Sequence, residues 1–166
     1  MKYTFALLGF ILLGFSSQAQ TKDADVTAIE KQVDAMVNSW NKHDYSDMKT
    51  YATEDCSWVN IVGMVWKNRK EVEYAHQFYH TNMFKHTTMT IKGVSVRILN
   101  ASTALVHFKS YVSEFTTPSG QKMPGSDDMA LLVFVKEKGK WLLTAGENVV
   151  VDPLAQKHDP VLHMNK

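Results

Sequence analysis

The sequence has a single cysteine and no excess of charge of either sign, and each shortage excludes a class of protein. Cys56 is the only cysteine among 166 residues, so no disulfide can form within the chain and a zinc site built from several thiolates is excluded. Lysine and arginine together number 18 and aspartate and glutamate 17, a net charge of +1. This balance offers no basic surface for a phosphate backbone, so we expect no nucleic acid among the partners.

One long hydrophobic run lies at the N-terminus. Tyr3 to Phe15 follow Lys2 and carry no charge, and Ser17 and Ala19 fit the small-residue rule for a cleavage site. The run is shorter than the roughly 18 residues that a membrane span needs. We therefore expect a signal peptide over residues 1–19, no stable membrane anchor, and a mature chain that is periplasmic or secreted.

Two stretches of the remaining chain have the spacing of amphipathic helices. The apolar stripe of the first consists of Ile29, Val33, Met36, Val37 and Trp40. The stripe of the second consists of Val72, Ala75, His76, Tyr79 and Met83. Between them we expect a shorter helix, capped by Asp44, that turns Met48 and Tyr51 inward.

Strand patterns account for most of the rest of the chain. One strand is expected over Cys56 to Ile61, and four long ones rich in Val, Ile, Thr and Phe follow. These four are Thr87 to Leu99, Ser102 to Phe115, Met129 to Val135 and Trp141 to Val151. The apolar positions change parity at Gly93, which predicts a bulge that bends the sheet. The order of elements predicts an α+β domain over residues 20–151, followed by a C-terminal tail over 152–166.

Five short stretches carry a further pattern: Trp40 to Asp44, Tyr51 to Asp55, Gly63, Lys140-Trp141 and Glu147-Asn148. With the order of elements, they resemble the nuclear transport factor 2-like superfamily, and most closely its SnoaL-like group. The resemblance implies a cone in which three N-terminal helices pack on a curved, mostly antiparallel β-sheet and enclose a pocket. It also implies a homodimer formed through the outer face of the sheet. Members include steroid isomerases, polyketide cyclases, dehydratases and binding modules, so the resemblance implies no single activity.

The steroid-isomerase members allow a residue-by-residue test of the resemblance. Their base aspartate falls on Asn60, their oxyanion tyrosine on Met36 and their second oxyanion donor near Leu131, and a supporting tyrosine falls near His76. An asparagine cannot take a proton from carbon, and methionine or leucine cannot donate a hydrogen bond to an enolate. Steroid isomerisation by that route is therefore excluded.

The last hairpin predicts which residues share a face with the pocket. A tight turn at Lys138-Gly139 pairs residue 137 with residue 140. Continued along both strands, this register places Leu131 opposite Gly146 and Met129 opposite Asn148. We therefore expect Met129, Leu131 and Asn148 to face the pocket.

His76 is the best candidate for a catalytic residue, because it is a titratable group in an apolar helix stripe. A neutral core histidine bonded to a neighbour such as Asn60 is the alternative. His76 and His80 have the i, i+4 spacing of a metal-binding pair, but the residues between them lack the glutamate of the hydrolytic motif, so we expect no metal.

These residues predict a pocket, lined by apolar and aromatic side chains, that binds a small apolar or amphipathic molecule without a cofactor. If the protein is an enzyme, we expect an isomerisation, cyclisation or dehydration in which His76 transfers the proton and Asn60 and Asn148 polarise an oxygen. A non-catalytic scaffold or protein-interaction module of the same fold is the alternative. The expected pocket residues are Met36, Trp40, Tyr51, Trp58, Asn60, His76, Tyr79, His80, Met129, Leu131 and Asn148.

Overall fold

The computed structural model describes residues 12–164, with side chains from Asp23 onward. The predicted signal peptide lies outside the described residues over 1–11, and over 12–19 only the backbone is described. It therefore stays a prediction. No helix among the described residues is long and apolar enough to span a membrane.

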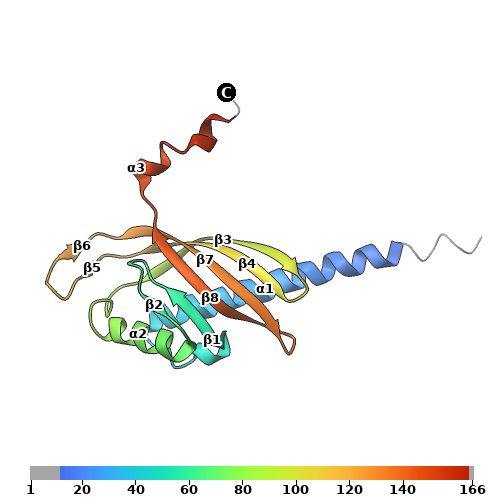
Figure 1. The fold of residues 1–166 in the computed structure, drawn as a ribbon, viewed down its shortest axis with the longest axis horizontal. Coiled ribbons are helices and arrows are strands. Elements are labelled where there is room, and N and C mark those ends of the chain that lie inside the picture. The colour runs from blue at the N-terminus through green and yellow to red at the C-terminus, as the bar shows by residue number, and fades with distance from the viewer. Residues whose placement is uncertain (1–11, 165–166) are drawn as a thin grey trace, which may run out of the picture.

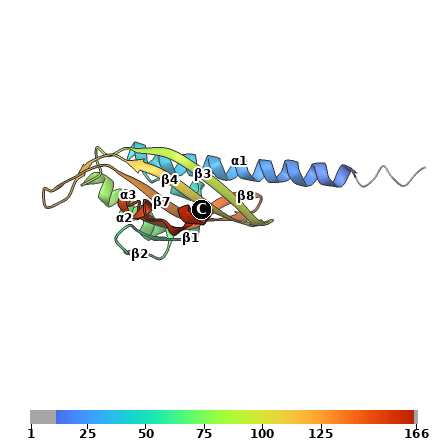
Figure 2. The same cartoon turned by 90° about the horizontal axis from the view of Figure 1, so that it is seen from above.

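A long helix, α1 (Leu12–Lys42), crosses one face of the sheet, as Figures 1 and 2 show from two directions. Its predicted stripe is confirmed, since Ile29, Val33 and Val37 are buried in the core against the sheet. The helix ends at Lys42, and the next residue, His43, adopts a left-handed backbone with φ of 55°. This conformation ends the helix and turns the chain back toward the sheet.

The predicted second helix is only a single 3₁₀ turn, η1 (Met48–Thr50). Asp44 accepts a hydrogen bond from the backbone N–H of Ser46 and so closes a turn instead of capping a helix. Asp47 accepts a hydrogen bond from Ser39 Oγ at 2.7 Å and caps nothing. Met48 and Tyr51 are nevertheless buried, as predicted.

Six strands form one curved sheet in the order β2-β1-β8-β7-β4-β3, in which only the pair β1–β8 is parallel. With the helices against this sheet, the α+β cone predicted from the sequence is confirmed. The strands are β1 (Ala52–Val59), β2 (Val65–Trp66), β3 (Met89–Asn100), β4 (Thr103–Val112), β7 (Ser126–Glu137) and β8 (Lys140–Val150). A separate hairpin of β5 (Phe115–Thr116) and β6 (Lys122–Met123) extends the loop before β7.

Two bulges set which side chains face the core. The register between β3 and β4 shifts at Gly93, which confirms the predicted bulge. A second shift lies in β8, where Thr144 has no partner in the register with β7. Beyond it, Leu131 pairs with Glu147 and Met129 with Val149, so the predicted partners were wrong by one residue. Because neighbouring strand residues point to opposite faces, the extra residue turns Gly146 and Asn148 to the core face of β8. Met129 and Leu131 stay on the outer face, because Asp128, Ala130, Leu132 and Phe134 of β7 alternate toward the core without a break.

The second long helix, α2 (Arg69–Thr81), packs on β1 at the end of the sheet where α1 ends. Asn68 caps it by accepting a hydrogen bond from the Glu71 N–H, and the Glu71 carboxylate accepts one from the Lys67 N–H. These two bonds satisfy backbone N–H groups on both sides of the N-cap and fix where the helix starts.

The tail continues from β8 as α3 (Pro153–Gln156) and a 3₁₀ turn, η2 (Pro160–His163). It projects away from the domain in Figure 1. Its large apolar side chains, including Leu154 and Leu162, are exposed.

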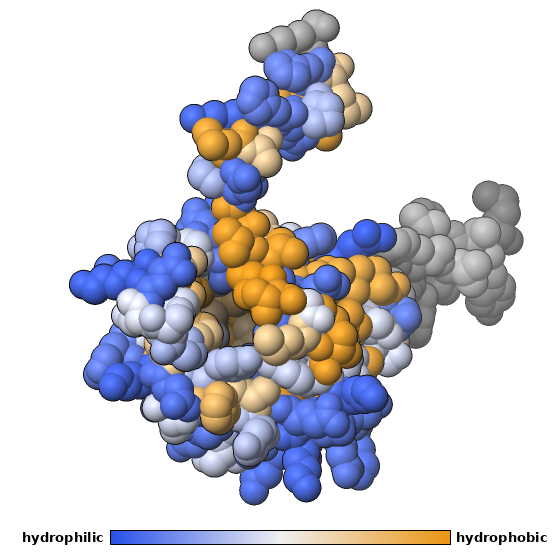
Figure 3. All heavy atoms as spheres, turned by 60° about the vertical axis from the view of Figure 1, so that its left-hand side comes forward, coloured by the Kyte–Doolittle hydropathy of each residue, from blue (hydrophilic) through white to orange (hydrophobic). Residues whose placement is uncertain are grey.

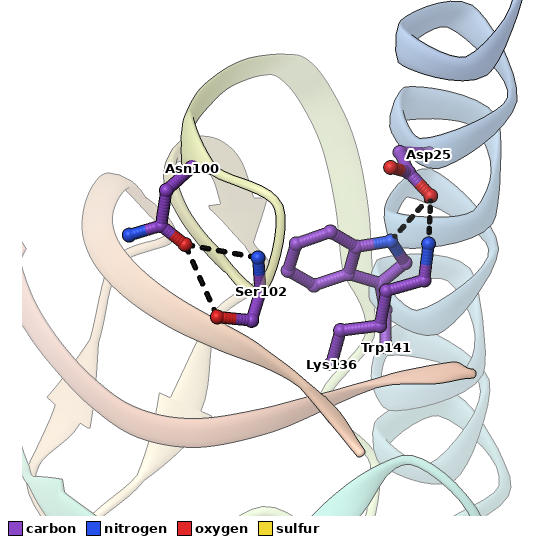
Figure 4. Close-up of polar contacts among 5 residues, drawn as sticks. All are labelled: Asp25, Asn100, Ser102, Lys136 and Trp141. Atoms are coloured by element: carbon purple, nitrogen blue, oxygen red, sulfur yellow. Dashed lines mark hydrogen bonds and ion pairs between the residues drawn. The ribbon is translucent and has the colours of Figure 1, made fainter. Parts of the chain in front are cut away.

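Near the start of the described side chains, α1 is joined to the sheet by one carboxylate (Figure 4). Asp25 Oδ1 accepts hydrogen bonds from Trp141 Nε1 at 2.9 Å and from Lys136 Nζ at 2.7 Å. These bonds, with that to Lys136 the stronger influence, hold the pKa of Asp25 below its ordinary value. In the same view, Asn100 accepts two hydrogen bonds from Ser102 and closes the β3–β4 turn.

Candidate functional site

A cavity of about 90 Å³ lies between the helices and the sheet. In Figure 3 the drawn face is hollowed beside the apolar surface from which the tail leaves. Most of the cavity wall consists of apolar, tyrosine and tryptophan side chains. The other polar side chains in the wall are those of His76, Ser110, Asp128 and Asn148. The lining residues are Met36, Trp40, Tyr45, Met48, Tyr51, Trp58, Val72, His76, Met89, Phe108, Ser110, Asp128, Ala130, Leu143 and Asn148.

His76 stands on the helical wall of the cavity, on α2. Its Nδ1 lies 2.8 Å from the carbonyl oxygen of Val72. Because a carbonyl can only accept, Nδ1 carries the proton and Nε2 keeps a lone pair. Burial among the rings of Tyr45, Trp58 and Trp66 lowers the pKa of His76 to about 4. The imidazole is therefore neutral near pH 7 and offers an acceptor.

Asp128 stands on the sheet wall, at the start of β7. Its carboxyl group is buried, and Oδ1 accepts a hydrogen bond from Ser126 Oγ at 2.9 Å. Burial raises the pKa of Asp128 and the charge of Asp127 adds to this, while the bond from Ser126 acts in the opposite direction. Ser110, also buried, lies directly across from Asp128 on β4. The sheet thus brings an acid and a hydroxyl to the same part of the cavity.

Asn148 reaches the cavity from β8 and is oriented by Trp58. The indole Nε1 donates a hydrogen bond to Asn148 Oδ1 at 3.0 Å, which leaves the amide Nδ2 group as the free donor. Trp58 lies directly over Gly146, where any Cβ would collide with the indole ring. A glycine at this point of β8 therefore makes room for the tryptophan that holds Asn148.

Two polar atoms of the cavity wall are buried without a hydrogen-bond partner among the described residues. They are Trp40 Nε1 and the hydroxyl of Tyr51, a residue only 1% exposed. Burial raises the pKa of Tyr51, so its hydroxyl stays protonated. Buried polar groups without partners are rare, and a bound molecule or water commonly satisfies them.

The structure brings together six of the predicted pocket residues as cavity-lining side chains. They are Met36, Trp40, Tyr51, Trp58, His76 and Asn148. Five others lie elsewhere, for different reasons. Met129 and Leu131 are on the outer face of β7, and the Thr144 bulge of β8 brings Asn148 to the other face. Asn60 closes the turn after β1 by accepting hydrogen bonds from the backbone N–H groups of residues 62 and 64.

Tyr79 and His80 also lie outside the cavity lining. Tyr79 packs against Trp66 on the outer side of α2 and donates its hydroxyl to Met64 Sδ at 3.5 Å. His80 is buried behind the lining and bonds to Tyr45 and His43. Among the described residues, no three His, Cys, Asp or Glu side chains converge as metal ligands would.

Two functional candidates, Asp128 and Tyr45, are absent from the pocket residues predicted from the sequence. Asp128 follows the Pro124-Gly125 turn, and turn chemistry is the ordinary explanation for an aspartate there. Tyr45 lies in the link between α1 and η1 and belongs to no periodic stripe. The alternation of Asp128 with the buried residues Ala130 and Leu132 would have identified Asp128 if the face of β7 had been known.

The comparisons with known proteins support this architecture. Residues 29–146 match the SnoaL-like domain family. An uncharacterised protein with a cystatin-like fold from Caulobacter vibrioides is 30% identical, with a TM-score of 0.81, over 84% of this chain and 98% of that chain. No curated protein matches the sequence.

Two provisionally assigned dehydratases share the fold at lower identity. A scytalone dehydratase from Novosphingobium aromaticivorans is 13% identical, with a TM-score of 0.69, over 81% of this chain and 89% of that chain. A dehydratase of the NTF2-like family from Streptomyces avermitilis is 20% identical, with a TM-score of 0.65, over 78% of this chain and 97% of that chain. The match over residues 29–146 shows the family, and these structures show the fold: the chain belongs to the SnoaL-like domain family and shares its fold with proteins of the nuclear transport factor 2-like superfamily.

Proposed function

We propose that the protein binds a small, largely apolar molecule in the cavity between its helices and its sheet. The observation that carries this proposal is a largely apolar cavity whose lining residues include two with a buried polar atom, Trp40 Nε1 and the Tyr51 hydroxyl, that has no partner among the described residues. A water needs roughly 10–15 Å³ of such volume. A cavity of about 90 Å³ therefore has room for a molecule the size of one substituted ring.

The polar groups of the cavity define what such a molecule would carry. His76 Nε2 accepts a hydrogen bond, the Asn148 amide nitrogen donates one, and the Asp128 carboxyl does either according to its protonation. A ring with one or two oxygen substituents would satisfy these groups and leave its apolar face against methionine and tryptophan side chains.

Binding of ring-sized fragments tests the proposal. We expect phenols and benzyl alcohols to shift the NMR signals of cavity-lining residues and to raise the melting temperature. Ala130→Leu should abolish binding, because Ala130 lines the cavity and a larger side chain fills it. Val133→Leu on the same strand but the opposite face is the matched control and should bind as the wild type does. Equal binding by both variants would place the ligand outside the cavity and refute the proposal.

Acid–base catalysis on the bound molecule is a second candidate function, and the raised pKa of Asp128 favours it. A buried carboxyl group with a raised pKa transfers protons more readily near neutral pH than an ordinary aspartate does. His76, with a pKa of about 4, is a weak base and is better suited to orient the ligand. The role first expected of His76 is therefore assigned to Asp128.

Two reactions of small ketones test catalysis: exchange of a carbon-bound proton with solvent, and loss of water. Wild-type protein in D₂O should incorporate deuterium into an α-acidic ketone or dehydrate a β-hydroxy ketone of cavity size. Asp128→Asn should lower the rate at least 100-fold while fragment affinity changes little. If the rate is unchanged in Asp128→Asn, proton transfer by this residue is refuted, and binding alone stands.

Export to the periplasm or the medium is part of the proposed function, and the N-terminal hydrophobic run supports it. Intact mass measurement of the protein from a secreting host tests it. A mature chain that begins at Gln20 supports cleavage after Ala19. A chain that retains residues 1–19 and stays in the cytoplasm would refute export.

A homodimer through the outer face of the sheet is likewise proposed. Leu131 on β7 and Val149 on the neighbouring strand β8 both lie on that face, and both are substantially exposed. Sedimentation velocity should give twice the monomer mass, and Leu131→Glu should return the monomer because it places a charge in an apolar interface. A wild-type protein that is monomeric at every concentration of a 100-fold dilution series would refute a stable dimer.

A further inference from the structure

Three side chains beside the cavity, His43, His80 and Tyr45, form a continuous hydrogen-bond chain. His43 Nδ1 lies 2.7 Å from His80 Nδ1, and His80 Nε2 lies 3.1 Å from the hydroxyl of Tyr45. His43 is partly exposed where α1 ends, His80 is buried on α2, and Tyr45 lines the cavity. The chain therefore runs from the surface of the protein to the cavity wall.

The two histidines can be bonded only if a single proton lies between their Nδ1 atoms, because two lone pairs or two N–H groups would repel. In one arrangement His80 donates to His43, and Tyr45 donates its O–H to His80. In the other arrangement His43 donates to His80, and His80 Nε2–H donates to the Tyr45 oxygen. Only the second arrangement leaves the Tyr45 proton free to point elsewhere.

Protonation of His43 removes the first arrangement. A charged imidazole carries a proton on both nitrogens, so His43 Nδ1 must donate to His80. His80 must then donate from Nε2 to Tyr45. The charge remains on His43, since burial first, and then the neighbouring His43 and His76, lower the pKa of His80 to about 3.

We infer that Tyr45 is a specificity-determining residue of the cavity and that the His43–His80 pair makes it a hydrogen-bond donor when His43 is protonated. The ligand class that this favours is a small ring with an anionic or strongly accepting oxygen, such as a carboxylate or an enolate. The inference rests on the proposed function, since it assigns the chemistry of the ligand that the cavity binds.

Within the hydrogen-bond chain of His43, His80 and Tyr45, His43 is the residue that can take up a proton from solvent. On α2, His76 is the titratable neighbour of His80, and it is neutral near pH 7. On the side of η1, Tyr51 is the titratable neighbour of Tyr45, and burial keeps both hydroxyls protonated. Lys42 and Asp44 flank His43 in the sequence and are exposed.

The link that carries His43 and Tyr45 is held to α2 by a separate clamp. Gln77 accepts a hydrogen bond from the Tyr45 N–H at 3.1 Å and donates one to the His43 carbonyl at 3.0 Å. One α2 side chain thus fixes the backbone of both outer members of the chain. The two proton arrangements can therefore exchange without movement of the heavy atoms.

The protonation state of each histidine nitrogen, measured by ¹⁵N NMR on the purified protein, tests the chain without a ligand. As the pH falls and His43 becomes charged, His80 should convert fully to its Nε2–H tautomer while staying neutral. In His43→Asn, a residue that tolerates the left-handed backbone at this position, the tautomer of His80 should not respond to pH. His107→Gln, at an exposed site on β4, is the matched control and should leave the response intact.

Two outcomes of the NMR measurement would overturn the inference. One is a His80 tautomer that stays constant across the titration of His43 in the wild-type protein. The other is a response that persists in His43→Asn. Tyr45→Phe provides a second variant, in which His80 Nε2 loses its partner and the His80 signals should shift at every pH.

Calorimetric titration with benzoate and benzyl alcohol tests the ligand class. Benzoate should bind about tenfold more tightly when His43 is protonated than when it is neutral, because a donated hydrogen bond to a charged oxygen is a strong one. This gain should disappear in Tyr45→Phe and in His43→Asn, and benzyl alcohol should show none. A benzoate affinity that follows the same pH dependence in all three proteins would overturn the ligand class. If neither probe binds, the proposed function fails, while the histidine signals still decide the chain.

Discussion

The part of α1 whose side chains are described, from Asp23 to Lys42, meets the sheet in opposite ways at its two ends. Near the first end, Asp25 uses one oxygen to accept two hydrogen bonds from the sheet, and the indole N–H of Trp141 is satisfied. Near the second end, the indole N–H of Trp40 and the hydroxyl of Tyr51 are buried without partners among the described residues. A satisfied buried group adds stability, whereas an unsatisfied one costs stability and persists where something else uses it. The Asp25 contact stabilises the packing of α1 on the sheet. The two unpartnered groups instead leave hydrogen-bonding capacity for a bound molecule.

Trp141→Ala should break the first contact most severely. Trp141 is 2% exposed and belongs both to the core and to the Asp25 contact. We expect the free energy of unfolding to fall by about 3–5 kcal/mol, measured by urea denaturation. Trp66→Ala, at the half-buried end of the sheet, should cost less. A larger loss for Trp66 would reverse the comparison between the two ends.

Acidification should destabilise the cavity end through His76. Its pKa is about 4 in the folded protein and near 6.5 in the unfolded chain, so the unfolded state binds the extra proton first. Stability should therefore fall between pH 6.5 and pH 4, by on the order of 2 kcal/mol. In His76→Gln, the unfolding free energy should depend less on pH across this window. An unchanged slope would mean that His76 titrates normally in the folded state.

Asp25→Ala should lower the free energy of unfolding by about 1–2 kcal/mol, because it leaves Lys136 and the Trp141 N–H without their acceptor. Since the pKa of Asp25 is lowered on folding, its contribution is complete above the unfolded value near 3.8 and is lost as the pH falls through the folded value. Asp23→Ala, exposed on the same helix, is the control and should change stability by less than about 0.5 kcal/mol. Equal effects of the two variants would contradict a specific role for Asp25.

Tyr51→Phe should have the smallest effect, and of the opposite sign. The hydroxyl that it removes has no partner, so its loss should be neutral or raise the free energy of unfolding by up to about 1 kcal/mol in thermal or urea denaturation. Fragments with an acceptor oxygen should bind Tyr51→Phe less tightly. A loss of stability similar to that of Asp25→Ala would mean that the hydroxyl is bonded after all, and the contrast between the two ends would disappear.

The sequence predicts the fold better than it predicts the cavity. The stripe of α1, the existence of α2, the long strands and the Gly93 bulge depend on local periodicity, and all are found. The predicted stripe of α2 is found only in part, because Tyr79 lies on the outer side of the helix and Met83 lies beyond its end. The face of β7 is different, because Met129 to Val135 contain almost only apolar residues and show no alternation. The predicted side of Met129 and Leu131 depends on their pairing with the last strand. The Thr144 bulge shifts that pairing, and no glycine or proline marks its position in the sequence.

The same reason explains which site residues were found. Trp58 and His76 belong to elements whose inward face is visible in the sequence, and they line the cavity. Asn148 also lines the cavity, but it reaches the core face only through the Thr144 bulge. Asp128 lies on the strand with no visible alternation, and Tyr45 lies in an irregular link. Asn60 sits one residue beyond the end of β1, where an asparagine closes a turn more readily than it continues a strand.

The C-terminal tail is a suitable place to attach a label to this domain. Every hydrogen bond within residues 153–164 joins neighbours in the tail itself, and β8 completes the sheet before the tail begins. A dye, a tether or a surface linkage placed there would report on the molecule without disturbing its interior. Conversely, a protease that trims these residues should leave a compact fragment whose unfolding is the same as that of the intact protein.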